Sequence, residues 1–251
     1  MTSKLAARAA LAAATLFALS LAGRAAQAHQ LWIEQDAQGG ARVYLGEYAA
    51  NLREDSPGML DKLTRLAVRL VGASGEAALT VTKGATFVTL DKRAAKNESI
   101  VAEETGFPLF ESKDDQGKTV RTAWTPAARF VPDLAARTPA LTLDLVPTGK
   151  PNELQAFFRG KPLARAEITV LSGSGWTRET TTDADGKVTL ALPWRGFYVI
   201  EVEHTEEAAG ARKTDKGEER YDSAMFATTL SFTSKSGPAA PAGPPPSPPS
   251  E

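Results

Sequence analysis

The sequence is poorest in the residues that most often carry metal, thiol or nucleophile chemistry. Its 251 residues include no cysteine and only two histidines, His29 and His204. The lack of cysteine excludes disulfides, thiolate catalysis and metal sites built on thiolate sulfur. A chain of this length can bury enough surface to fold without disulfides. Because catalytic triads that need a histidine base are hard to build from two histidines, we expect no enzymatic activity.

An excess of charge of either sign is also missing. Lysine and arginine number 29 against 30 aspartates and glutamates, which gives a formal net charge of −1. No basic patch dominates the chain, and this argues against nucleic acid as a partner. The glycine-rich nucleotide motifs and the HExxH and GxSxG motifs of hydrolases are absent too. The sequence therefore gives no support to those nucleotide-binding and hydrolase classes.

The first 28 residues have the pattern of a secretory signal peptide. Lys4 and Arg8 form a basic start, residues 9–22 are apolar, and Ala-Gln-Ala precedes His29. The apolar run is shorter than the roughly 20 residues that a membrane-spanning helix needs. No later segment is long and apolar enough to span. We therefore expect cleavage between Ala28 and His29, and a periplasmic or secreted protein whose mature chain has no transmembrane segment.

Residues 150–234 are predicted to form an Ig-like β-sandwich. Short runs rich in aromatic and β-branched residues are separated by turn sequences such as "TDADGK" and "PWRG". Such punctuation is typical of a sandwich of short antiparallel strands. The strands are expected at 153–159, 166–171, 187–192, 197–204 and 223–232.

Residues 29–149 are predicted to form a second β-rich domain with one or two short helices. One helix is expected over 56–66, where Ser56 is a plausible cap and Pro57 occupies the first position. Residues 92–139 show no pattern that can be assigned. Strands are expected at 29–35, 40–48, 66–72, 77–84, 86–91 and 140–147.

The C-terminal segment 235–251 is predicted to be a disordered, proline-rich tail. Residues 236–251 contain seven prolines and no large apolar side chain. A segment of this composition cannot form a core of its own, and it favours an extended chain. The whole protein is therefore predicted to be mainly β, with two β-rich regions between a cleaved leader and this tail.

His29 gains a special capability if cleavage follows Ala28. A terminal histidine can close a chelate ring on one metal ion with its free α-amine and its ring Nδ1. The amine is largely protonated near neutral pH, but a metal ion can displace that proton. Nitrogen ligands of this kind suit nickel, cobalt, copper or zinc better than calcium or magnesium. The alternative is that the residue at the cleavage site is arbitrary and solvated.

His204 is the second candidate ligand. It ends the predicted strand "FYVIEVEH", where a sheet would hold the ring and the following polar loop would leave it accessible. We therefore hypothesise that His29 and His204 meet at one metal site. An ordinary surface histidine is the alternative, because sequence spacing alone does not bring the two together.

Two stretches of the sequence resemble known families. "GKPLARAEITVL" followed by "TRETTTDADGKVTLALPWRGFYVIEVEH" is similar to the carboxypeptidase-regulatory-like, prealbumin-type β-sandwich. The leader, the His-x-x-Trp start, "YLGEY" and the closing "YDSAMFATTLSF" resemble a family of bacterial periplasmic proteins. Its members carry a domain-of-unknown-function label or are named as periplasmic components of cobalt/nickel uptake. The resemblance implies that His29, with His204, holds metal, and that Trp32 and Tyr221 support the site.

Three functions follow as hypotheses, in order of preference. The first is an exported protein that binds nickel, cobalt or copper and presents it to a membrane metal transporter. The second is an envelope adaptor or carbohydrate-binding module without metal, in which Trp124, Trp176 and Trp194 would form a contact strip. The third is a copper oxidative enzyme, for which the sequence shows no flat aromatic docking face.

Overall fold

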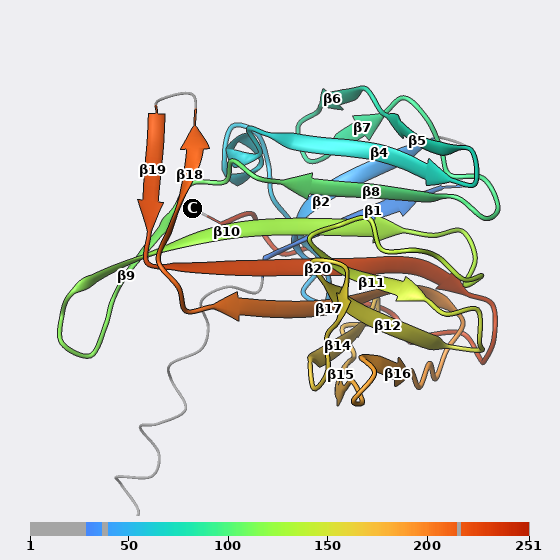
Figure 1. The fold of residues 1–251 in the computed structure, drawn as a ribbon. Coiled ribbons are helices and arrows are strands. Elements are labelled where there is room, and N and C mark those ends of the chain that lie inside the picture. The colour runs from blue at the N-terminus through green and yellow to red at the C-terminus, as the bar shows by residue number, and fades with distance from the viewer. Residues whose placement is uncertain (1–28, 37–39, 215–216, 251) are drawn as a thin grey trace, which may run out of the picture.

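The fold is built almost entirely of β-strands, as predicted. The computed structural model describes residues 29–36, 40–214 and 217–250, so the predicted signal peptide lies outside the described residues. The described strands form three sheets and a two-stranded ribbon (Figure 1). No helix in these described ranges has the length and apolarity needed to cross a membrane.

The first sheet contains β1 (Gln30–Gln35), β2 (Ala41–Glu47), β3 (Leu52–Arg53), β6 (Val81–Lys83) and β7 (Val88–Leu90). The central sheet contains, in order, β15 (Thr177–Thr181), β14 (Glu167–Ser172), β17 (Gly196–Glu206), β20 (Ser223–Ser234), β10 (Thr119–Phe130), β8 (Ser99–Glu104), β4 (Leu66–Gly72) and β5 (Gly75–Ala78), with β9 (Phe110–Lys113) paired to β10. The third sheet contains β11 (Leu143–Pro147), β12 (Glu153–Phe158), β13 (Lys161–Pro162) and β16 (Lys187–Thr189), and the ribbon contains β18 (Gly210–Thr214) and β19 (Gly217–Tyr221).

The central sheet is covered on both faces. Figure 1 shows β1 and β2 behind it and β11 and β12 in front of it. Side chains of successive strand residues point to opposite faces, so each strand of the central sheet can serve two cores. In β17, Val199 belongs to a cluster with Trp32 of the first sheet, whereas Ile200 packs with Leu154 of the third sheet. The first sheet and the third sheet therefore lie on opposite faces of the central sheet.

The central sheet joins the two regions that the sequence separates near residue 150. β10, from the first region, pairs in parallel with β20, from the second, in a register that runs from Thr122↔Ser223 to Phe130↔Ser231. The side chain of Thr229 also donates a hydrogen bond to the carbonyl of Leu31 at 2.6 Å. The two predicted regions thus share one sheet.

The segment 92–139, which shows no assignable pattern, supplies three strands of the central sheet, namely β8, β9 and β10. β10 was hard to predict because Pro126 lies near its middle, and proline is unfavourable in a central strand. Pro126 lies between the residues that pair with β9 (Thr119–Thr122) and those that pair with β8 (Ala127–Phe130). Pro126, which has no amide hydrogen to donate, is therefore not needed for pairing with β8 or β9.

The predicted helix over 56–66 is wrong. A single 3-10 turn, η1 (Met59–Lys62), is the only helical element among the described residues. Asp61 accepts hydrogen bonds from the Ser56 hydroxyl and the Gly58 amide, which stabilises a compact turn. β4 begins at Leu66, so too few residues remain for a stable α-helix.

The predicted strand over 77–84 is divided between β5 of the central sheet and β6 of the first sheet. Leu79, between them, is buried in the core beneath the first sheet, and its amide donates to the Val68 carbonyl at 2.9 Å. The predicted strand over 187–192 also ends early, since β16 stops at Thr189. These differences shift strand boundaries and leave the β-rich assignment unchanged.

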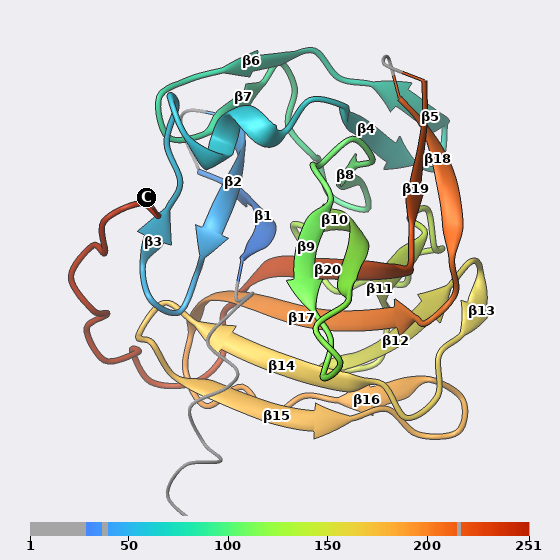
Figure 2. The same ribbon diagram turned by 90° about the vertical axis from the view of Figure 1, so that its left-hand side faces the viewer.

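The proline-rich tail differs from the disordered segment that was predicted. Figure 2 shows it running past β3. Ser247 forms a bridge with Leu52, and the Asn51 side chain donates to the Pro244 carbonyl at 3.1 Å. The tail has no core of its own, but its carbonyls and serines find hydrogen-bond partners along the β2–β3 turn. It reaches as far as His29, because the Ser250 hydroxyl lies 3.3 Å from the ring Nε2.

Candidate metal centre

His29 directly precedes β1, and its ring is held by a buried carboxylate. The ring Nε2–H donates to Oε1 of Glu54 at 2.5 Å. The Glu54 side chain is fully buried, and the imidazole is 19% exposed. The backbone amide of Ser250 also donates to the Glu54 carboxylate, at 3.2 and 3.3 Å. A ring fixed in this way has one defined orientation and one remaining nitrogen.

The pairing of three strands brings His29 and Glu54 together. Gly46 of β2 lies opposite both Gln30 of β1 and Arg53 of β3, so the residues next to them meet at the same end of β2. Gly46 has a φ of 147°, and a Cβ there would collide with the Leu52 carbonyl oxygen. Glycine is therefore required at the point where the β2–β3 hairpin closes on β1.

The hydrogen bond to Glu54 determines which ring nitrogen is available. A neutral imidazole carries one N–H, and the acceptor-only carboxylate places it on Nε2. Nδ1 is then left without a proton and can bind a cation. Histidines that ligate metals commonly donate their other ring N–H to a carboxylate in this way. Nδ1 is also the nitrogen that could chelate together with a terminal α-amine.

A small cavity adjoins the His29 ring. Its volume is about 70 Å³, and it is lined by His29, Met59, Phe110 and Trp124. This volume suits an ion better than an organic ligand, because small-molecule pockets measure roughly 300–1,000 Å³. The Met59 sulfur is 2.8 Å from the exposed Lys62 ammonium. Met59 also lines the cavity of the candidate imidazole, and its thioether is a soft ligand.

The surroundings of His204 are those of a packed aromatic residue. Its ring lies against Phe158 with centroids 4.3 Å apart, and it pairs in register with Phe226 of β20. The guanidinium of Arg159 covers the Phe158 ring and forms two hydrogen bonds with Glu206, at 2.9 and 2.7 Å. This arrangement accounts for His204 by stacking, without any ligand role.

The structure does not bring His29 and His204 together. Gln30, next to His29, donates to Glu201 of β17 at 2.7 Å, so β1 begins on the face to which Glu201 points. His204 is three residues further along β17 and therefore points to the opposite face. Two imidazoles separated by a continuous sheet cannot bind the same ion, so His204 is not a ligand of a His29 site.

The two residues expected to support the site are also separated. Trp32 is fully buried in a separate cluster with Val199, stacks on Tyr44 with centroids 5.3 Å apart, and donates from Nε1 to Glu34 at 2.9 Å. Tyr221, at the end of β19, packs against the core beneath the third sheet. Trp32 therefore lies on the His29 side of the central sheet, and Tyr221 on the His204 side.

The three tryptophans of the carbohydrate hypothesis do not form one strip. Trp124 is buried in the core beneath the first sheet. Trp176 and Trp194 contact each other edge to face, with centroids 5.3 Å apart. Trp176 packs against the other core. Without a shared exposed surface, the three rings cannot dock one glycan chain.

A second carboxyl group on the His29 side has an altered acidity. Burial, the larger cause, and the nearby Glu203 carboxylate together raise the pKa of Glu201 to about 8. The hydrogen bond from Gln30 acts in the opposite direction. Glu201 can therefore bind or release a proton near neutral pH. It is hydrogen-bonded to Gln30, the residue that follows His29.

The candidate donors at His29 are few. Within residues 29–36, 40–214 and 217–250, no group of three or more His, Asp or Glu side chains could hold a metal ion. The donors are Nδ1 of His29, the Met59 sulfur and, if the leader is removed, the α-amine. Met59 and Glu54 were not predicted from the sequence, although Met59 is one of only three methionines in the chain.

Comparison with known proteins places most of this architecture in one family. The sequence profile of "Domain of unknown function (DUF4198)" matches residues 26–206, which is more than half of the chain. Neither the curated proteins nor the solved structures gave a match. The matched range includes His29, Glu54 and Met59 and ends where β17 ends. The chain belongs to the DUF4198 family, an uncharacterised domain family.

Proposed function

We propose that this protein is exported, that cleavage after Ala28 frees the amine of His29, and that this amine and Nδ1 bind a transition metal ion. The protein would hold nickel, cobalt or copper outside the cytoplasm and present it to a membrane transporter. It would act as a carrier in metal uptake and would catalyse no reaction. The metal is its cargo.

The observation that carries this proposal is the hydrogen bond from His29 Nε2 to the buried Glu54 carboxylate. It orients the ring and, in the neutral imidazole, leaves Nδ1 free to bind an ion. Metal binding does not have to order the His29 ring, because this hydrogen bond already fixes its orientation. A histidine that merely happened to follow a cleavage site would have no need of a buried carboxylate partner.

The remaining donors favour copper among the three metals. Met59 lies on the same small cavity as His29, and thioether sulfur is a ligand that copper accepts more readily than nickel or cobalt does. Two nitrogens and one thioether make a site of low coordination number. Such a site releases its ion more readily than a closed four-ligand structural site, which suits delivery.

We also infer that the third sheet and strands β14, β15, β17 and β20 correspond to a prealbumin-type, carboxypeptidase-regulatory-like sandwich. The support is the core between them, which contains Leu145, Leu154, Ile168, Ile200 and Leu230. In this arrangement the sandwich would position His204 only as a packing residue. The proposed metal site belongs to the first sheet.

The test compares two proteins that differ only in their amino-terminal group. Both begin at His29, one with a free α-amine and the other with that amine acetylated. Calorimetric titration with nickel, cobalt and copper should give one-to-one binding to the first protein. Acetylation removes the amine from the chelate, so we expect affinity to fall roughly 100-fold, or about 2.7 kcal/mol. The second protein keeps every other donor.

Two results would overturn the proposal. Equal affinity of the two proteins would show that the amine is not a ligand. Amino-terminal sequencing of the exported protein would also reject it if processing occurred at another bond. His204→Ala serves as the matched control, because it removes the other histidine and should leave metal affinity unchanged.

A further inference from the structure

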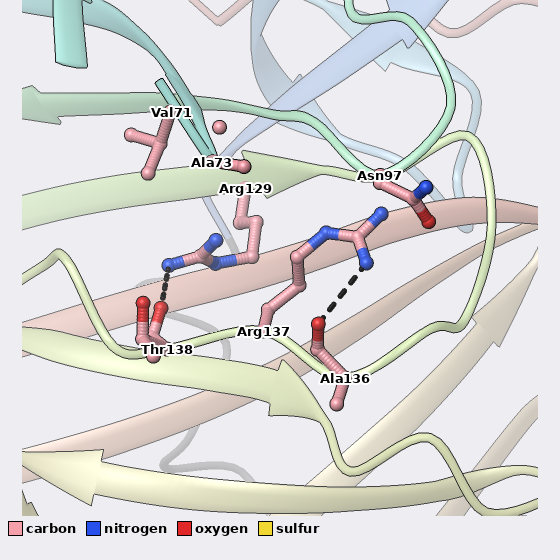
Figure 3. A pocket seen from close by; sticks show the side chains of 8 residues that line it. Val71, Ala73, Asn97, Arg129, Ala136, Arg137 and Thr138 are labelled. Carbon is pink, nitrogen blue, oxygen red and sulfur yellow. Dashed lines mark hydrogen bonds between the residues drawn. The ribbon is translucent and has the colours of Figure 1, made fainter. Parts of the chain in front are cut away.

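A second, larger cavity lies far along the chain from the His29 site. Its volume is about 390 Å³, within the range of small-molecule pockets. It is formed by the tip of the β4–β5 hairpin, the turn before β8, β10 and the connection from β10 to β11. Figure 3 shows its labelled lining residues, which include two arginines. The lining residues are Val71, Gly72, Ala73, Asn97, Arg129, Ala136, Arg137 and Thr138.

Each of the two arginines has one nitrogen without a partner. The Arg129 side chain is fully buried and donates from Nε and Nη2 to Asp144, at 2.9 and 2.6 Å. Its Nη1 has no hydrogen-bond partner. Arg137, whose side chain is 7% exposed, donates from Nη2 to Asp133 at 2.9 Å and from Nη1 to the Ala135 carbonyl at 2.8 Å. Its Nε is also unpartnered.

Ser99, next to the cavity lining, supplies a third unpartnered group. It begins β8 and lies opposite Val71, which lines the cavity. Val101, two residues further along β8, pairs with Arg129, so Ser99 and Arg129 point to the same face of the central sheet. The buried Ser99 hydroxyl has no hydrogen-bond partner. Two unpartnered donors therefore belong to residues that line the cavity, and a third belongs to a residue paired with the lining residue Val71.

The grouping of these unpartnered donors needs an explanation. Five buried side-chain polar atoms of the described residues have no partner, and three of them belong to Ser99, Arg129 and Arg137. Buried donors in native proteins are nearly always satisfied, so a cluster of unsatisfied donors indicates a missing acceptor. All three atoms can donate, and an ionised oxygen group is the acceptor that can serve several donors at once.

We propose that this cavity binds the carboxylate of a small organic acid. The arginines are already paired with Asp144 and Asp133, so the site is close to neutral and suits a singly charged group better than a phosphate. The other lining residues, Val71, Gly72, Ala73 and Ala136, offer a small apolar surface for the body of the acid. The proposal does not depend on the metal site.

The donors are shielded from bulk water, and this has two consequences. A carboxylate that reaches them binds in a low-dielectric setting, where hydrogen bonds to charged groups are strong. The cavity wall must also relax as the acid enters. Ala73 and Ser74, in the exposed turn between β4 and β5, can move without disturbing the core.

The test is a calorimetric titration of metal-free mature protein with acetate, succinate and benzoate, with phosphate as the competing oxyanion at matched ionic strength. We expect at least one acid to bind and to raise the melting temperature. Ser99→Ala should weaken that binding roughly tenfold, because one donor is lost. Without acid, its melting temperature should be unchanged or higher, since the alanine leaves no unsatisfied hydroxyl.

A matched pair of variants tests the location. Ala73→Phe fills the cavity and should abolish binding, whereas Ala77→Phe, on the exposed strand β5 of the same hairpin, should not. Failure of all three acids to bind would overturn the proposal, as would full binding by Ser99→Ala and Ala73→Phe. Binding of phosphate in preference to every acid would overturn the assignment to carboxylates.

Discussion

The two sides of the central sheet treat buried carboxylates differently. On the side of the third sheet, fully buried Asp144 is paired with the guanidinium of Arg129. On the side of the first sheet, the partner of buried Glu54 is the His29 ring, and that of Glu201 is the Gln30 side-chain amide. A guanidinium keeps its charge at any ordinary pH, whereas an imidazole or an amide supplies no fixed cation. The buried carboxylate on the side of the third sheet therefore has a permanent counter-charge. Those on the side of the first sheet have none, so protons or metal ions can affect them.

Removing the fixed cation should give the largest effect. In Arg129→Met, Asp144 stays buried without its partner, so we expect the free energy of unfolding to fall by about 3–5 kcal/mol. Urea denaturation at neutral pH measures this loss. The double variant Arg129→Met/Asp144→Leu should recover most of it, because an apolar pair of similar volume replaces the buried ion pair. A small loss in the single variant would show that Asp144 finds another cation or water.

On the opposite side, removing the charge of Glu54 should affect metal binding. Glu54→Gln keeps an oxygen that can accept from His29 Nε2 but removes the negative charge beside the ring. We expect metal affinity to fall about 10–100-fold, the usual effect of losing such a partner. Titration calorimetry measures it, with Glu34→Gln as the control on the same sheet. Unchanged affinity would mean that Glu54 serves stability alone.

Glu201 should make stability depend on pH. Its pKa rises from 4.5 to about 8 on folding, so between these values the folded state holds a proton that the unfolded state has released. Stability is then greatest below pH 4.5 and falls as pH rises toward 8. We expect the unfolding free energy to fall by on the order of 2 kcal/mol over this pH range. The effect is limited because Glu201 keeps some contact with solvent.

Two variants separate this effect from other titrations. Glu201→Gln should reduce the fall in unfolding free energy between pH 5 and pH 8, as measured by urea denaturation at several pH values. Glu203→Gln removes the neighbouring carboxylate that raises the pKa of Glu201, so it should move the midpoint to lower pH. A pH profile that Glu201→Gln leaves unchanged would assign the dependence to another group.

Much of the fold could be predicted, because strand patterns are local. The alternating and apolar runs that became β12, β14, β17 and β20 are visible in the sequence. β10 was not, since Pro126 and several small or charged residues hide a strand whose stability comes from neighbours on both sides. Local propensity is weak evidence where pairing with distant strands decides the structure.

The candidate site was only half predictable. His29 stands out because of its position after the leader, but Glu54 and Met59 approach it only through the closing of β1, β2 and β3 and the turn η1. The placement of His204 failed for a similar reason. A single step along β17 reverses the face to which a side chain points, and the sequence does not say which sheet covers that face.

The smallest effect should come from His204. In His204→Ala the ring leaves its stack with Phe158, which itself packs edge to face on Phe226, so we expect a loss of about 0.5–1.5 kcal/mol in unfolding free energy. Metal affinity should not change. His29→Ala should do the reverse, because it removes the chelating nitrogen while most of the core stays intact. If both substitutions weakened metal binding equally, His29 and His204 would have to bind the same ion. Their placement on opposite faces of the central sheet, which follows from the β17 register, would then be wrong.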